Sequence, residues 1–348
     1  MNIKFVTSML ILLISHQVFS DEIRPGVMRT PEDRFANLVG YPFKPHYIVI
    51  DGMRLHYLDE GPKNAETIFL LHGEPNWSFL FRTMIPVFTD AGYRVVAPDL
   101  VGFGKSDKYL SKSEYTYGGQ VKFMHDLVER LDLREVTFFG QDWGGLIGLR
   151  VVAEAPNRFS RVVVSNTGLP AAQGLAGKFG YSFFKFVLKI MGTVTIEDLR
   201  SELTFIRWAA YSQSVDDLPI SDVMAVLGGG KQRDPGYEAP FPDRRYKAGA
   251  HIMPYLVPSE LQQNQNAWEE VFESWNKPFL VAFSDRDPIT AAGETIFLER
   301  VPNAQRVTIR GAGHFVQEDA GPELSKLIID FIKGRRLQDE ISVGYQSP

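Results

Sequence analysis

Apolar residues occur along this chain in short runs that alternate with amphipathic stretches of helical length. Eight runs have the β-branched and aromatic content of buried strands and are bounded by turn-forming residues such as Gly, Pro and Asp. They are Tyr47–Ile50, Arg54–Leu58, Thr67–Leu71, Tyr93–Ala97, Val136–Phe139, Arg161–Ser165, Phe279–Phe283 and Arg306–Ile309. Strands that alternate with helices form βαβ units. The pattern therefore predicts an α/β fold with a mainly parallel eight-stranded sheet, helices on both faces, and ligands at the carboxyl ends of the strands.

The pattern changes between Thr167 and about Pro258, where no clean buried strand occurs. Aromatic helical stretches at Tyr181–Met191 and Leu203–Tyr211 are followed by a loop-like segment, Gly228–Asp243. We interpret residues 168–258 as a helical cap, or lid, inserted between two parts of the core, 21–167 and 259–334. The last segment, 335–348, is polar and is expected to be a frayed tail.

The first twenty residues have the three-part pattern of a secretory signal peptide. Lys4 precedes an apolar run from Phe5 to Ile14, and Val18 and Ser20 stand where a signal peptidase requires small residues. The run is too short to cross about 30 Å of hydrocarbon comfortably. An uncleaved signal anchor and a buried core segment are the alternatives. We expect residues 1–20 to be removed and the mature chain to be exported, periplasmic or secreted, without a membrane span.

The composition of the chain excludes several classes of protein and several kinds of site. With 44% hydrophobic and 23% charged residues, the chain is typical of globular proteins, which excludes disorder and coiled coils. A net charge of −5 argues against a nucleic-acid-binding surface, because such surfaces normally carry a basic excess. The chain contains no Cys, which excludes disulfides, thiolate metal sites and a Cys nucleophile.

The segment Gly140-x-Asp142-x-Gly144 has the spacing of a nucleophile elbow, a tight turn from a strand into a helix. Alone this motif is weak, because an Asp at such a point also caps helices. An aspartate is ionised at pH 7 without help from a base. It is a competent nucleophile towards an sp3 carbon that carries a leaving group. The product is an alkyl ester on Asp142, which water must then cleave.

Cleavage of that ester requires a general base and an oxyanion hole. We predict that His314, after the last strand, is the base and that Asp287, after the penultimate strand, orients it. The chain order of nucleophile, acid and histidine is that of hydrolytic triads built on strand ends. Asp285 is the alternative acid, and backbone N–H groups of Glu74 and Trp143 are expected to form the oxyanion hole.

Taken together, these motifs resemble those of the haloalkane dehalogenases, a family with the α/β-hydrolase fold. The resemblance extends from about Tyr41 to Lys333 and is carried by the segments 72–79, 98–108, 141–144, 239–243 and 313–318. It implies hydrolysis of haloalkanes to alcohol and halide through an ester on Asp142, which water activated by His314 then cleaves. The expected partners are a small apolar halogenated substrate, water and the halide product. We expect no metal or organic cofactor to be required.

The resemblance also implies that two tryptophan indole N–H groups hold the departing halide. Trp143 matches the first of them. The second belongs on the cap helix around Tyr181–Met191, which contains no Trp. Phe184 stands at the expected position, with Lys189 as the alternative, and Trp208 is not expected to take the role. Because Phe has no N–H to donate, one hydrogen bond to the halide is expected to be lost.

We expect an apolar substrate cavity between cap and sheet. The residues predicted to line it are Phe183, Phe184, Phe186, Phe241, Pro242 and Ile289. The alternative is that each phenylalanine packs in the hydrophobic core and does not line the cavity.

Two other functions remain open at this stage. An epoxide hydrolase uses the same Asp-His-Asp triad and needs two cap tyrosines as acids. The cap contains several candidates, namely Tyr181, Tyr211, Tyr237, Tyr246 and Tyr255. A non-catalytic binding protein with a hydrolase fold is the other alternative. The sequence does not determine the oligomeric state.

Overall fold

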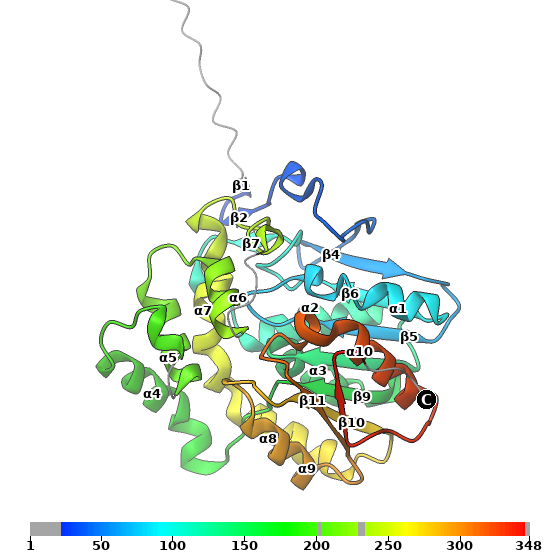
Figure 1. Cartoon of the computed structure of the whole chain (residues 1–348). Helices are drawn as coiled ribbons and strands as arrows, with labels where there is room; N and C mark the ends of the chain where they lie inside the picture. The colour runs from blue at the N-terminus through cyan, green and yellow to red at the C-terminus, as the bar shows by residue number, and fades with distance from the viewer. Residues whose placement is uncertain (1–21, 201–202, 229–233, 345–348) are drawn as a thin grey trace, which may run out of the picture.

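One mixed sheet organises the chain (Figure 1). The structure is a computed structural model that describes residues 22–200, 203–228 and 234–344. In this part of the chain the sheet has nine strands, in the order β12-β11-β10-β9-β8-β5-β6-β4-β3. β4 runs antiparallel to β3 and β6, and all other neighbours are parallel. The strands are β3 (His46–Ile50), β4 (Met53–Glu60), β5 (Thr67–Leu71), β6 (Arg94–Pro98), β8 (Val136–Gln141), β9 (Phe159–Ser165), β10 (Phe279–Ser284), β11 (Gln305–Arg310) and β12 (Glu340–Ser342).

Central strands of this sheet are buried on both faces, as expected where helices cover a parallel sheet. Every residue of β5, β8 and β10 is buried. The helices of the core are α1 (Ile85–Asp90), α2 (Tyr117–Arg130), α3 (Trp143–Glu154), α9 (Ala292–Arg300) and α10 (Val316–Ile332). α1 packs with α10 on one face of the sheet, and α2 packs with α3 on the other (Figure 1). All eight predicted strands are confirmed, and so is the predicted α/β fold class.

Between β9 and β10 the described residues form helices without a strand. These helices are α4 (Gly174–Ile190), α5 (Thr204–Ser214), α6 (Ile220–Leu227), α7 (Ala248–Leu256) and α8 (Leu261–Glu270). Figure 1 shows α4 to α7 gathered at one side of the molecule, with α4 and α5 at its outer edge. Arg82, just before α1, ties this region to the core because its guanidinium contacts both Asp234 and Glu318. A second, three-stranded sheet joins β1 (Glu22–Arg24), β2 (Val27–Met28) and β7 (Lys108–Tyr109).

No helix among the described residues is both long and apolar enough to span a membrane.

The C-terminal segment corrects one expectation. The sequence predicts a frayed tail over residues 335–348, but Glu340–Ser342 adds β12 as a ninth, parallel strand beside β11. Ile341 lies opposite Ile309 and is buried. The burial of one apolar side chain and the unpaired edge of β11 explain why this polar segment becomes ordered.

Replacement of Ile341 by Ala is expected to destabilise the protein by about 2 kcal/mol, because it removes buried apolar volume at the sheet edge. Val343→Ala, two residues along and 65% exposed, is the matched control and is expected to have little effect. Urea unfolding of both variants measures the difference. Equal stability of the two variants would show that β12 does not contribute to the fold.

Candidate active site

Asp142 occupies a tight turn between β8 and α3. Its backbone φ is +53° and its ψ is −129°, in a region that non-glycine residues rarely adopt. Such a conformation costs about 1–3 kcal/mol and persists only where its surroundings enforce it. Here the Asp142 N–H donates to the carbonyl of Asn166 at 2.9 Å, and the Thr167 hydroxyl donates to the carbonyl of Asp142 at 2.6 Å. The segment after β9 therefore holds the elbow in place.

Two glycines allow the elbow to approach β5 closely. A Cβ on Gly144 would lie 1.9 Å from the carbonyl oxygen of Leu71, and a Cβ on Gly73 would lie 2.5 Å from the Cβ of Asp142. Neither position accepts a side chain without movement of the backbone. This close approach brings the loop after β5 against the Asp142 carboxylate. The Glu74 N–H consequently donates to Asp142 Oδ1 at 2.8 Å.

His314 and Asp287 meet Asp142 at the carboxyl ends of the strands. His314 Nδ1 lies 2.9 Å from Asp287 Oδ1, and His314 Nε2 lies 3.5 Å from Asp142 Oδ2. The Asp287 carboxylate also accepts from the backbone N–H groups of Ile289 and Thr290, at 2.9 and 3.2 Å. The structure thus brings the three predicted residues together in the geometry of a nucleophile, a base and an orienting acid.

The alternative acid, Asp285, binds groups other than His314. Its carboxylate accepts from the Gly311 N–H at 2.7 Å and lies near the guanidinium of Arg310. His72 is likewise bound to backbone, since its Nε2 accepts from the Leu100 N–H and its Nδ1 lies 2.8 Å from the Gly73 carbonyl. Burial lowers the pKa of His72, which favours its neutral form. Its contacts with the backbone give His72 a structural role.

The charges at this site are strongly coupled. Burial alone would lower the pKa of His314, but the carboxylates of Asp287 and Asp142 outweigh it and raise the pKa to about 10. Burial alone would raise the pKa of Asp287, but the charge and hydrogen bond of His314 hold it below its usual value. At neutral pH the site therefore contains an imidazolium between two carboxylates.

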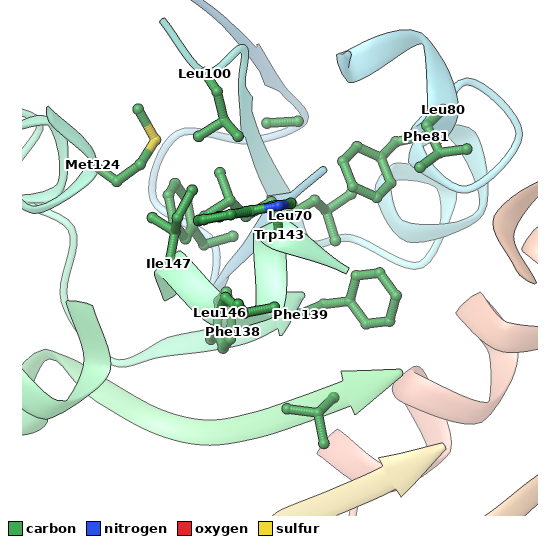
Figure 2. Packing of buried hydrophobic residues seen from close by; sticks show 14 of the residues in the cluster. Leu70, Leu80, Phe81, Leu100, Met124, Phe138, Phe139, Trp143, Leu146 and Ile147 are labelled. Carbon is green, nitrogen blue, oxygen red and sulfur yellow. The ribbon is translucent and has the colours of Figure 1, made fainter. Parts of the chain in front are cut away.

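An apolar cavity of about 230 Å³ opens beside this carboxylate. Asp142, Trp143, Trp208 and Ile289 line it together with Glu74, Leu146, Thr167, Gly168, Leu169, Pro170, Phe205, Pro254, Val257, Thr290, Ala292, Gly293 and Ile296. The ring of Trp143 is 1% exposed and packs edge-on against Tyr117, within a cluster that includes Leu100, Met124 and Ile147 (Figure 2). This packing fixes the tryptophan beside the carboxylate.

The structure corrects the predicted lining of this cavity. Ile289 lines it, but Phe183 is 67% exposed and faces solvent on α4. Phe184 stacks on Phe205 with ring centroids 5.9 Å apart, and it is not among the lining residues. Phe241 is buried against Phe103, and neither it nor its neighbour Pro242 is among the lining residues. Phe186, 58% exposed, also faces solvent on α4.

Three residues that the sequence argument did not select support the site. Asn166 directly follows the buried strand β9, and its side-chain amide nitrogen lies 2.9 Å from the carbonyl of His314. The Gln141 amide nitrogen lies 3.2 Å from His314 Nε2. Trp208 from α5 lines the cavity, as does the buried Glu74. Asn166 could have been selected from the sequence, because it is a polar residue directly after a buried strand. No neighbouring sequence motif identifies Trp208.

In residues 22–200, 203–228 and 234–344, no group of three or more His, Asp or Glu side chains is arranged to hold a metal ion.

Residues 66–321 match a family model described as the alpha/beta hydrolase fold. The chain is 42% identical over 322 residues to a haloalkane dehalogenase of Psychrobacter cryohalolentis, an alignment that covers 88% of this chain and 98% of the relative. Haloalkane dehalogenase 1 of Mycobacterium tuberculosis has the same identity and coverage. The solved tetrameric structure of the haloalkane dehalogenase DpaA from Paraglaciecola agarilytica NO2 has a TM-score of 0.73 and 32% identity, and the match covers 86% of this chain and 96% of DpaA.

Fold and site together define an α/β hydrolase with an aspartate at the nucleophile elbow. Within this class, the two relatives indicate the family, because each alignment covers 98% of the relative at 42% identity. The chain belongs to the haloalkane dehalogenase family. The resemblance predicted from the motifs is therefore confirmed, as is the predicted enzyme class.

The charge on His314 is expected to make stability depend on pH. Because its pKa is raised from 6.5 to about 10 on folding, its contribution is complete below about pH 6.5 and is lost as the pH rises through 10. The difference in unfolding free energy between wild type and His314→Gln should therefore shrink from pH 6 to pH 10. Urea unfolding across this range measures it. A difference that stays constant would contradict the imidazolium at neutral pH.

Proposed function

We propose that this protein hydrolyses small apolar haloalkanes to alcohol and halide through a covalent ester on Asp142. The observation that carries the proposal is the meeting of Asp142, His314 and Asp287 at the edge of an apolar cavity. Asp142 attacks the carbon that carries the halogen. The carbon–halogen bond breaks and its electron pair leaves with the halide. A cavity with little water favours this step, because the carboxylate is less solvated there.

The second step uses the charge coupling of the triad. Ester formation removes the negative charge of Asp142, which is one of the two charges that raise the pKa of His314. His314 then releases its proton to solvent and accepts one from a water molecule that attacks the ester carbonyl. The developing oxyanion is held by the backbone N–H of Glu74, which already contacts Asp142 Oδ1, and by the backbone N–H of Trp143. Collapse releases the alcohol and restores the carboxylate and the imidazolium.

The halide needs donors in an otherwise apolar cavity. We assign the first to the indole N–H of Trp143 and the second to Trp208, because both rings line the cavity that contains Asp142. Glu74 also lines this cavity, and burial followed by the charge of Asp142 raises the pKa of its carboxyl well above the usual value. The raised pKa favours the neutral form of Glu74, which does not repel an arriving anion. Phe184 offers no donor and is not among the residues that line this cavity.

The geometry gives less support to an epoxide hydrolase. That reaction needs tyrosine acids beside the nucleophile to protonate the epoxide oxygen. Among the described residues that line the cavity at Asp142, none is a tyrosine. Tyr237 instead donates to Glu318, and Tyr181 packs edge-on against Tyr255. The other alternative, a non-catalytic binding protein, does not explain why Asp142, His314 and Asp287 are brought together.

Export remains part of the proposal. Residues 1–20, which carry the signal-like pattern, lie outside the described residues. Expression of the whole chain in a bacterium with an outer membrane is expected to give a periplasmic or secreted protein that begins at Asp21. N-terminal sequencing of the cell fractions measures this. A cytoplasmic product that retains Lys4 would contradict export.

Replacement of His314 by Phe should leave the first step intact and block the second, because the water then has no base. With a bromoalkane, the Asp142 peptide of this variant should become heavier by one alkyl group, as measured by mass spectrometry. His125→Phe, on α2 and outside the cavity lining, is the matched control and should show no adduct at steady state. An unmodified Asp142 in a folded His314→Phe variant would contradict the covalent mechanism.

Replacement of Trp208 by Phe should weaken bromide inhibition of turnover. A hydrogen bond to a charged group is worth roughly 1.5–3 kcal/mol, or about one to two powers of ten in affinity. Trp275→Phe changes a buried tryptophan that does not line the cavity, and it should leave bromide inhibition unchanged. Unchanged bromide inhibition in a folded Trp208→Phe variant would contradict the assignment of Trp208 as the second donor.

A further inference from the structure

The outward face of α4 exposes five large apolar side chains. They are Leu175, Phe179, Phe183, Phe186 and Ile190, with exposed fractions between 58% and 75%. Their spacing of three or four residues places them in one stripe along the helix, which we call the α4 apolar face. Single exposed apolar residues are ordinary, but a contiguous stripe of five marks an interaction surface.

Three lysines accompany this stripe along one edge. Lys178, Lys185 and Lys189 recur at spacings of seven and four residues, and all three are exposed. The seventeen residues of α4 include no Asp or Glu. Among the described residues none of these lysines forms an ion pair, although Lys185 lies 4.6 Å from the centre of the Tyr181 ring. The helix is thus locally cationic on a protein whose net charge is −5.

The inward face of the same helix explains why the apolar face is not needed for folding. Leu188 is buried, Tyr181 packs against Tyr255, and Phe184 packs against Phe205. These contacts seat α4 on the neighbouring elements, and α4 forms the outer edge of the molecule in Figure 1. The apolar face therefore points away from the rest of the chain.

We propose that α4 docks on the surface of an anionic lipid bilayer, with its apolar face in the acyl region and its lysines at the headgroups. An amphipathic helix with aromatic and aliphatic residues on one side and cations beside them has the chemistry of such a surface. Anionic headgroups neutralise the lysine edge. A second copy of α4 provides three further lysines and no acid, so pairing of two such helices leaves the edge uncompensated. The inference is independent of the reaction at Asp142.

Cosedimentation of the mature chain with vesicles tests the proposal. We expect binding to vesicles of phosphatidylcholine mixed with phosphatidylglycerol, weak binding to phosphatidylcholine alone, and release by salt. The variant Phe179→Ser, Phe183→Ser, Phe186→Ser should lose binding. The double variant Val39→Ser, Val343→Ser changes exposed apolar residues elsewhere and should retain it. Each variant should keep wild-type turnover of a water-soluble bromoalkane, which shows that it is folded.

The lysine edge is tested separately. Lys185→Gln with Lys189→Gln should weaken vesicle binding by roughly fivefold per lysine. Lys44→Gln with Lys333→Gln makes the same change of charge at exposed sites elsewhere and should have no comparable effect. Failure of wild type to bind the anionic vesicles would overturn the proposal, and so would equal weakening by both lysine pairs. Sedimentation velocity adds a further outcome, since a dimer abolished by the triple Phe variant would assign this face to a second copy instead.

Discussion

The strained turn at Asp142 is the constraint on which the rest of the site depends. A non-glycine residue with a φ of +53° is held there because β8 ends and α3 begins within a space that admits no side chain at Gly144. The turn exposes the carboxylate above the sheet and starts α3 beside it. It also brings the loop after β5 close enough for the Glu74 N–H to bind Asp142 Oδ1. Hydrogen bonds between Asp142 and the segment after β9 offset the strain.

The electrostatic coupling of His314 to Asp142 and Asp287 links the two proposed steps, ester formation and ester hydrolysis. His314 is buried between two carboxylates and carries a proton as long as both are charged. In the proposed mechanism, alkylation of Asp142 removes one of those charges, so the His314 imidazolium can release its proton and act as the base for ester hydrolysis. Asp287 remains charged throughout, because His314 and two backbone N–H groups stabilise its ionised form. In the proposed mechanism the same charged environment therefore serves both nucleophilic attack and ester hydrolysis.

Much of this architecture could be predicted from the sequence because the signals are local. Thr67–Leu71 and Val136–Gln141 are buried apolar strands followed by glycine-containing turns, and the order of Asp142, Asp287 and His314 places them at one edge of a parallel sheet. β12 could not be predicted, since Ile341 is its one buried side chain and its pairing with β11 is not local. The cap also could not be oriented, because α4 carries phenylalanines on both faces and only packing on Phe205 selects Phe184 as the inward one. Trp208 reaches the cavity from α5 through tertiary structure alone.

A single turnover in oxygen-18-labelled water, with enzyme in excess over a bromoalkane, tests the central claim most directly. If Asp142 attacks carbon and water then cleaves the ester at its carbonyl, the oxygen of the alcohol comes from the Asp142 carboxylate and the label enters Asp142. Mass spectrometry should therefore find unlabelled alcohol and a labelled Asp142 peptide. Labelled alcohol with an unlabelled Asp142 peptide would show that water attacks the substrate directly, and it would contradict the account.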